Sequence, residues 1–145
     1  PNVFNSYWNL PEKTKEDFSS DNYFNTGDKG FIDKDGYLSI VGRTKDMIIS
    51  GGLNVYPKEV ESLIDSYEEV EESAVIGLAD NDLGERVTAI VVPNANFHLS
   101  EDDIIFRLKK EIAGFKVPKN VIFVDDLPRN AMGKVQKNIL RDKYQ

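Results

Sequence analysis

The alternation of hydrophobic and polar residues along the chain changes several times, and each change predicts a new element. In GFIDKDGYLSIVGR, residues 30–43, two apolar runs flank Asp35-Gly36, which predicts a β-hairpin with a positive-φ turn at this pair. DMIIS, residues 46–50, predicts a short buried strand followed by a Gly-Gly turn. Two further apolar runs, SAVIGLA at 73–79 and ERVTAIVVP at 85–93, predict strands joined by a polar turn.

YPKEVESLID, residues 56–65, carries the signals of a helix. Pro57 suits the first turn, where no backbone N–H is needed. Glu59 and Glu61 are close enough to the N-terminus to complement the positive end of the helix dipole. The apolar stripe of this predicted helix consists of Val60, Leu63 and Ile64.

The last third of the chain predicts two more helices and one more strand. Ser100 and Asp103 have the spacing of a capping box, and Gly114 is expected to stop the helix that they begin. Its apolar positions are Ile104, Leu108 and Ile112. NVIFVDDLP, residues 120–128, predicts a strand, and a final helix is expected near 136–143. Because strands and helices mix without strict β-α-β alternation, the sequence predicts an α+β fold with a small mixed sheet and packed helices.

Composition limits the classes of protein that fit. The 145 residues allow one domain or parts of two, and the 40% of hydrophobic residues can form a core. No apolar run reaches the roughly 18–20 residues of a membrane span, and no signal-peptide pattern is present. The lack of cysteine excludes disulfides, thiolate metal ligands and a cysteine nucleophile, and it fits a cytoplasmic setting. His98, the single histidine, lies in a loop-like stretch and is expected at the surface rather than at a metal or a reacting group.

Charge is unevenly distributed over the chain. The net charge is −7, yet residues 107–143 hold ten Lys or Arg against four Asp or Glu. A basic end on an acidic protein suits a compact polyanion such as a nucleotide or coenzyme A. Nucleic acid fits poorly, because the acidic remainder would repel its backbone.

Lys134 is the most conspicuous cation of this basic region. It follows a glycine in LPRNAMGKVQKNILR, residues 127–141, on what is expected to be a flexible loop before the last helix. A phosphate-binding P-loop is excluded, because Pro128 and Val135 occupy positions where that motif needs Gly and Ser or Thr. Taken alone, Lys134 also fits an ordinary solvated loop lysine.

Two other segments contain turns whose residues could contact a ligand. In YFNTGD, residues 23–28, Asp28 follows a Thr-Gly turn, where a carboxylate could accept both hydroxyls of a ribose. Gly51 and Gly52 allow backbone to come close to a ligand, although a tight turn needs glycine equally. Asp33 and Asp35 do not form an EF-hand, because the later ligands of that loop are missing, and no metal site is predicted.

Taken together and in this order, these segments resemble the C-terminal motifs of the adenylate-forming superfamily. That superfamily comprises acyl-CoA synthetases, luciferases and peptide-synthetase adenylation domains. The matching stretches are Thr26-Gly27-Asp28, Gly42 to Asp46, Ser50 to Glu61, and Pro128 to Lys134. The resemblance extends over essentially the whole chain, and LPRNAMGKVQKNILR looks most like malonyl-CoA synthetases and their short- or medium-chain relatives.

The resemblance implies a two-step ligase. ATP, with Mg²⁺, and a small carboxylic acid would form an acyl-adenylate and pyrophosphate, and the thiol of coenzyme A would then displace AMP. By similarity, Lys134 is the adenylation lysine, and Asp28 and Arg43 bind the ribose and phosphate. Lys45 resembles the hinge of the mobile domain, with its neighbour Asp46 as the next candidate. The pantetheine tunnel would be lined by Ser50, Gly51 and Gly52.

The resemblance also divides the chain. Residues 1–44 look like the tail of a large N-terminal domain, and 45–145 look like the complete mobile C-terminal lid. The family's glycine-rich phosphate loop and its substrate pocket belong to the large domain, and the chain contains neither. The chain also starts at Pro1 rather than at methionine. We therefore expect a fragment that is inactive alone and whose partner is its own N-terminal domain.

Two other functions fit parts of the pattern. An adenylation domain that loads a carrier protein would use the same first step but a different acceptor. A non-catalytic module that binds coenzyme A or a nucleotide is less consistent with the presence of Asp28, Lys45 and Lys134 together.

Overall fold

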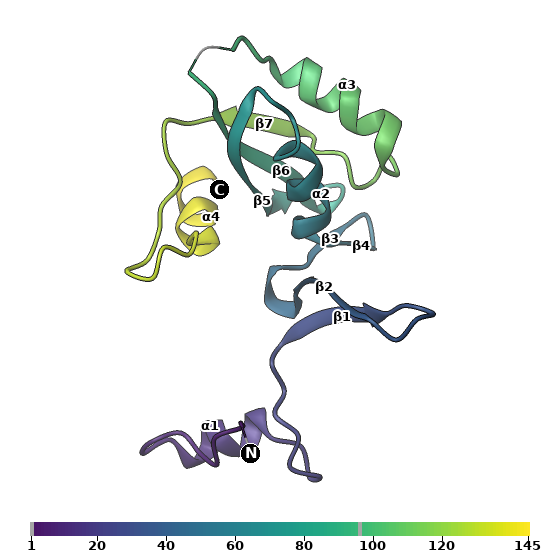
Figure 1. Cartoon of the computed structure of the whole chain (residues 1–145). Helices are drawn as coiled ribbons and strands as arrows, with labels where there is room; N and C mark the ends of the chain where they lie inside the picture. Colours follow the sequence, from purple (N-terminus) through teal and green to yellow (C-terminus); the bar gives the residue numbers. More distant parts are fainter. Residues whose placement is uncertain (1, 96) are drawn as a thin grey trace.

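A computed structural model describes residues 2–95 and 97–145 of the chain. A sheet with helices on both faces forms the body, and a β-hairpin and an N-terminal arm extend from it (Figure 1). The elements are α1 (Pro11–Asp17), β1 (Asp28–Ile32), β2 (Leu38–Arg43), the 3₁₀ helix η1 (Thr44–Asp46), β3 (Ile48–Ser50), β4 (Leu53–Val55), α2 (Pro57–Ile64), β5 (Val70–Asp80), β6 (Gly84–Pro93), α3 (Glu101–Glu111), β7 (Asn120–Phe123) and α4 (Lys137–Tyr144). The predicted α+β class is confirmed.

The main sheet has the order β4-β3-β6-β5, and β7 pairs with β6. The β5–β6 hairpin is long and antiparallel, whereas β7 lies parallel to β6 and is reached through α3. A parallel neighbour needs such a crossover, and a helix is its usual form. The sheet is therefore mixed, as the sequence predicted.

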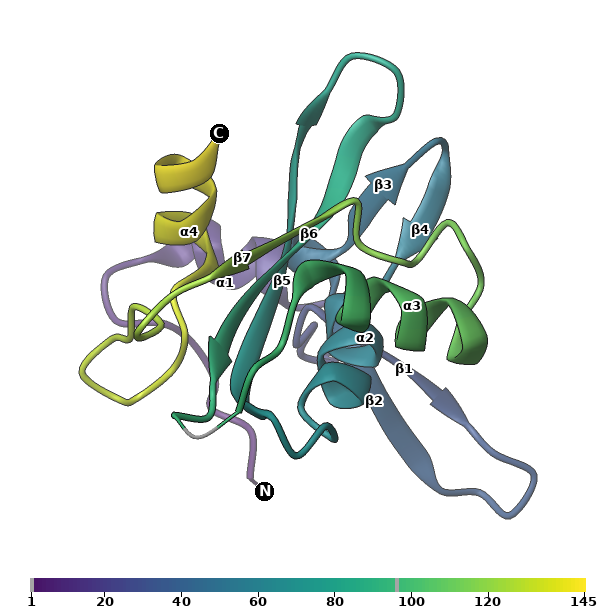
Figure 2. The same cartoon turned by 90° about the horizontal axis from the view of Figure 1, so that it is seen from above.

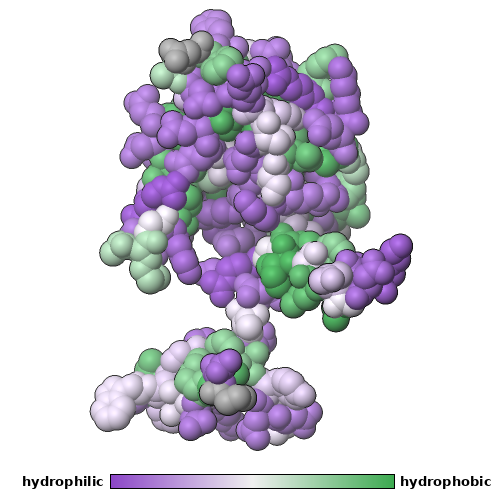
Figure 3. All heavy atoms as spheres, viewed as in Figure 1, coloured by the Kyte–Doolittle hydropathy of each residue, from purple (hydrophilic) through white to green (hydrophobic). Residues whose placement is uncertain are grey.

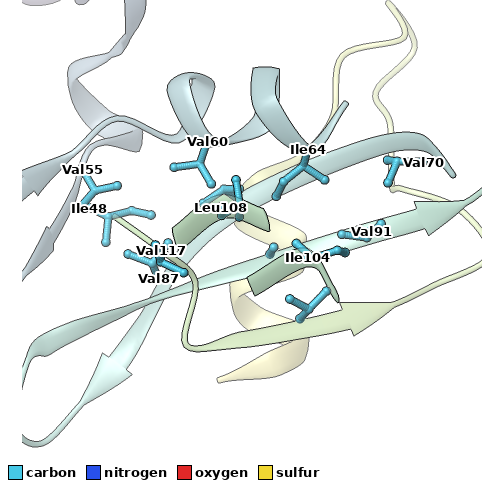
Figure 4. Packing of buried hydrophobic residues seen from close by; sticks show 13 residues of the cluster. Ile48, Val55, Val60, Ile64, Val70, Val87, Val91, Ile104, Leu108 and Val117 are labelled. Carbon is cyan, nitrogen blue, oxygen red and sulfur yellow. The ribbon is translucent and has the colours of Figure 1, made fainter. Parts of the chain in front are cut away.

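Around β5 and β6, both faces of this sheet are buried. On one face, α2 and α3 cover a cluster that includes Val60, Ile64, Ile104 and Leu108 (Figure 4). On the other face, Leu140 of α4 packs in a second cluster with residues of β5 and β6. Figure 2 shows α4 and the α2–α3 pair on opposite sides of the sheet. Because the middle parts of β5 and β6 meet water on neither face, these two strands contain continuous apolar runs in the sequence.

The helix predictions are confirmed, with one error at an end. Ser100 Oγ accepts the Asp103 N–H at 3.2 Å, and Asp103 Oδ2 accepts the Ser100 N–H at 3.1 Å, so the capping box is formed. The helix ends at Glu111 rather than near Gly114. Ile112 is already extended, although its N–H still bonds to the Leu108 carbonyl at 3.0 Å.

The segment after the first hairpin differs from its prediction. Residues 44–46 form the 3₁₀ helix η1, so the strand begins only at Ile48, and Ile49 is 49% exposed. The predicted turn at Gly51 and Gly52 is confirmed, with φ values of 58° and 78°. It joins β3 to β4, a strand that the sequence did not predict because three residues give too short a pattern.

The predicted hairpin at 30–43 is formed by β1 and β2. Within its loop, Gly36 has positive φ, whereas Asp35 does not. Asp33 Oδ1 instead accepts the N–H groups of Asp35 and Tyr37, both at 2.9 Å. The loop is thus a longer turn closed by a side chain, and Asp33 has a structural role.

The N-terminal arm folds around aromatic rings. Phe4 lies 4.9 Å from Tyr7 and 5.2 Å from Phe24 between ring centroids, and Phe18 packs on the same group. Phe24 thus supplies the rings of the first twenty residues with a neighbour from further along the chain. The helix α1 between them was not predicted.

One ion pair predicts how stability responds to acid. Arg107 of α3 donates two hydrogen bonds to Glu69, at 2.7 and 2.9 Å. These bonds lower the pKa of the Glu69 carboxyl from 4.5 to about 2. A lowered pKa in the folded state stabilises the protein above the ordinary value, and that stability is lost as pH falls toward 2. Glu69→Gln should therefore make the fall in thermal stability between pH 4.5 and 2 shallower. Melting curves at stepped pH test this, and an unchanged slope would assign the acid sensitivity to other carboxylates.

Candidate functional site

A pocket of about 520 Å³ opens between η1, the loop that follows β7, and the start of α4. Its lining includes Lys134, Lys45 and Arg43, three of the residues that the sequence singled out. They are contributed by segments about ninety positions apart in sequence. The fold thus brings together the predicted adenylation lysine and the predicted hinge.

The loop that carries Lys134 is closed by its own hydrogen bonds. Arg129 bridges with Val135, and the Asn130 N–H donates to the Lys134 carbonyl at 3.0 Å. Asn130 Oδ1 accepts the N–H groups of Met132 and Lys134, both at 3.0 Å. The segment that was expected to be a flexible loop is therefore a hydrogen-bonded turn with an exposed Lys134 side chain near its end.

The hinge candidates lie in η1. Lys45 is exposed, whereas the carboxylate of Asp46 pairs with Arg141 of α4 at 3.3 Å. The Thr44 N–H donates to the Gly27 carbonyl at 2.8 Å, which ties η1 back to the start of the hairpin. The single-turn helix is thus held from both sides.

Asp28 and Arg43 face each other at the open end of the first hairpin. They are paired residues of β1 and β2, and Arg43 Nε lies 3.3 Å from Asp28 Oδ1. Arg43 also donates to the Thr26 carbonyl at 3.0 Å. Because Arg43 lines the pocket, Asp28 adjoins it through this pair.

The structure does not bring Ser50, Gly51 and Gly52 to the pocket. Ser50 is buried, and the Gly51 N–H donates to the Leu83 carbonyl at 2.8 Å. Figures 1 and 2 place the β3–β4 turn and the loop around residue 134 at opposite ends of the body. The β3–β4 turn and the loop around residue 134 could therefore meet the same ligand only in turn, after the domain has rotated relative to that ligand.

The charge of the pocket suits an anion. Its lining contains one carboxylate, Asp46, and the cations Arg43, Lys45, Lys134, Lys137 and Arg141. Such a concentration of Lys and Arg matches phosphate oxygens. It does not fit Mg²⁺, which needs oxygen ligands, and within residues 2–95 and 97–145 no group of three potential metal-ligating side chains occurs.

Several contributors to this region were missed in the sequence. Lys137 and Arg141 are one helical turn apart on α4 and both line the pocket. The excess of Lys and Arg in residues 107–143 was the available signal, but it did not separate these residues from solvated ones. His98 is exposed, as expected. None of the helices within residues 2–95 and 97–145 is long and apolar enough to cross a membrane.

Fold and pocket together define a small α+β domain that presents Lys134 beside the residues of η1 in a cationic pocket. Residues 59–134, more than half of the chain, match the family model of the AMP-binding enzyme C-terminal domain, and the chain belongs to that family.

Several known proteins are similar to the chain. It is 48% identical over 142 residues to 3-[(3aS,4S,7aS)-7a-methyl-1,5-dioxo-octahydro-1H-inden-4-yl]propanoyl:CoA ligase of Rhodococcus jostii, covering 98% of this chain and 28% of that protein. It is 49% identical, with the same two coverages, to the long-chain-fatty-acid–CoA ligase FadD13 of Mycobacterium tuberculosis. The chain thus spans little more than a quarter of these relatives.

Two solved structures also match the chain over little more than a quarter of their own length. ATP-bound MatB from Rhodopseudomonas palustris has a TM-score of 0.92 and 56% identity, covering 99% of this chain and 28% of that one. Apo MatB from the same organism covers the same shares but has a TM-score of 0.76.

Proposed function

We propose that the chain is the C-terminal portion of an ATP-dependent acyl-CoA ligase. The observation that carries this proposal is the pocket that holds Lys134 and the η1 residues together on a domain of the AMP-binding enzyme family. The two relatives named above from Rhodococcus jostii and Mycobacterium tuberculosis are CoA ligases, which supports the same reaction here. The products would be acyl-CoA, AMP and pyrophosphate.

Within this function, residues 1–44 would belong to the large domain and 45–145 to the mobile one, with the hinge at Lys45. The difference in TM-score between the two MatB structures supports a movable element inside the segment, because almost the same sequence superposes with 0.92 in one and 0.76 in the other. Exposed apolar side chains on the first hairpin, including Phe31, Ile32 and Leu38, support burial against a further domain (Figure 3).

Different residues would act in adenylate formation and in thioester formation. In the first step, negative charge shifts between the reacting carboxylate and the α-phosphate, and the Lys134 ammonium would neutralise that charge. Asp28 and Arg43 would hold the ribose and phosphate. In the second step, rotation at the hinge would replace Lys134 by the β3–β4 turn, so that Ser50, Gly51 and Gly52 line the path of pantetheine. The separation of these two regions on the domain supports this division.

We propose a small carboxylic acid as the substrate, with malonate as the first candidate. The support is the likeness of LPRNAMGKVQKNILR to malonyl-CoA synthetases and the 56% identity to MatB. ATP and Mg²⁺ would be held mainly by the large domain, since the pocket described here offers a single carboxylate, Asp46, among five cations.

A segment exchange tests the proposed function. The part of FadD13 that aligns with this chain is replaced by this chain, and the product is called the swap ligase below. We expect the swap ligase to form long-chain acyl-CoA and AMP from ATP, coenzyme A and a long-chain fatty acid. FadD13 that lacks the segment altogether is the control and should form no thioester. A swap ligase that unfolds cooperatively but makes no acyl-CoA would reject the proposal, and turnover with a carrier protein alone would favour a carrier-loading enzyme.

The isolated chain should not catalyse the first step. With malonate or a short fatty acid, ATP–pyrophosphate exchange by the 145-residue chain is expected to stay at the level of a blank. The reason is that one cationic pocket without the large domain cannot align ATP with the carboxylic acid. Exchange above the blank would contradict the division into domains.

Lys45→Pro should separate the two half-reactions. Proline fixes φ near −65°, a value within the range of 3₁₀ helices such as η1, so the substitution is compatible with the present pose and opposes rotation away from it. We expect thioester formation by the swap ligase to fall by at least about tenfold while adenylate formation is retained, because a hinge works through large φ/ψ changes at few residues. Lys45→Ala, which removes the cation but leaves φ free, is the matched control. Equal rates in both halves after Lys45→Pro would place the pivot elsewhere, with Asp46 as the next candidate.

A further inference from the structure

Arg129 stands at the base of the loop that carries Lys134. Its guanidinium makes two contacts in different directions. Nη1 donates to the Gly133 carbonyl at 2.6 Å, and Nη2 pairs with the carboxylate of Glu72 in β5. Because Gly133 directly precedes Lys134, one side chain links the peptide next to the lysine to the main sheet.

The other hydrogen bonds of the loop fix its shape but not its place. The bonds made by Asn130 stay within residues 130–134, and the Gln136 N–H donates to the Pro128 carbonyl at 2.8 Å, which closes the base of the loop. Within the described part of the chain, the pair with Glu72 is the one hydrogen bond of residues 129–134 that reaches the sheet. Without it, the turn could keep its form and tilt as a unit.

We infer that Arg129, held by Glu72, is a positioning residue for Lys134 in the adenylate-forming step. This inference rests on the proposed function for its catalytic part. A displacement of about 1 Å at a reacting group can cost on the order of 10²-fold in rate, so a loop that tilts would weaken catalysis even with Lys134 in place. Arginine suits the task, since its planar fork offers separate donors to a carbonyl and a carboxylate, whereas lysine is a single point charge.

The first experiment needs no catalysis. Backbone ¹⁵N relaxation is measured on the 145-residue chain, its Arg129→Ala and Arg129→Lys variants, and an Arg107→Lys control. Arg107 also donates two hydrogen bonds to a glutamate, Glu69, but in a different part of the fold. We expect the order parameters of the Gly133 and Lys134 amides to fall from about 0.85 to below about 0.6 in both Arg129 variants and to stay unchanged in the control. Unchanged values in Arg129→Ala would overturn the positioning role.

The second experiment uses single-turnover kinetics of the swap ligase. Arg129→Lys is expected to lower the rate of adenylate formation by about tenfold while the KM for ATP stays within about twofold. The thioester step, started from supplied acyl-adenylate, should keep its rate. Arg107→Lys should leave the ratio of the two half-reactions as it is. Comparable losses in both half-reactions of Arg129→Lys would show a merely structural role and overturn the inference. If the swap ligase without any substitution is inactive, the proposed function is rejected. The relaxation experiment would still test whether Arg129 holds the loop, because it does not depend on catalysis.

Discussion

Lys134→Ala in the swap ligase is expected to slow adenylate formation by about 10²–10³-fold, the typical cost of removing one pre-aligned donor to developing charge. The side chain is exposed at the pocket between η1 and α4, so it is free to meet a ligand there. The KM for ATP should change less than the rate. Asp28, Arg43 and the large domain would still hold the nucleotide.

The same variant should keep most of its thioester-forming activity. When the reaction is started from acyl-adenylate and coenzyme A, rotation of the domain would already have carried Lys134 away from the reacting atoms. Lys134→Arg should restore little of the lost rate, because a planar fork does not replace a compact ammonium. Lys109→Ala, on the exposed side of α3, is the matched control and should change neither step. Comparable losses in both steps, or none in either, would leave Lys134 as a solvated loop lysine.

Much of the fold could be predicted from the sequence because its signals are local. The capping residues of α3, the Gly-Gly turn and the apolar runs of β5 and β6 each act within a few positions, and the structure confirms them. Features that depend on long-range pairing were missed. The parallel pairing of β7 with β6 and the short strand β4 have no distinct period of their own.

The candidate site shows the same limit. Motif order identified Lys134, Lys45 and Asp28, but only the fold brings Lys134 and Lys45 to one pocket. The partners that hold these residues were not predictable. Arg129 and Arg141 reach acidic residues 57 and 95 positions away, and no local pattern encodes such distances.

Glu61 is the clearest case in which a local rule predicted the element but not the contacts that its residue makes. Its place near the N-terminus of α2 predicted that its carboxylate complements the helix dipole. The residue is 7% exposed. One carboxylate oxygen accepts the Val75 N–H at 2.8 Å and lies 2.5 Å from Lys137 Nζ. Since β5 is the edge of the sheet in the described chain, the carboxylate caps a backbone donor that no strand pairs.

Glu61→Leu is therefore expected to lower the free energy of unfolding by about 3 kcal/mol, at the lower end of the cost of breaking a buried ion pair. The lower end applies because the Lys137 side chain is 18% exposed and can turn partly toward water. Glu61→Gln should cost less, since the amide oxygen can still accept the Val75 N–H. Chemical denaturation of the 145-residue chain gives these values.

A matched control and a double variant show whether the loss of stability in the Glu61 variants comes from buried charge. Glu59 lies on the same helix and pairs with Lys116 at 2.6 Å, but its side chain is 37% exposed, so Glu59→Gln should change stability by less than about 1 kcal/mol. If the cost at Glu61 comes from the buried charges, Lys137→Met should be destabilising in the wild-type background and nearly neutral beside Glu61→Gln, because no buried carboxylate is then left without its partner. Additive losses would mean that the two residues act independently. In that case each helix would be held to its own face of the sheet by packing, α2 at Ile64 and α4 at Leu140, and not by the charge pair between them.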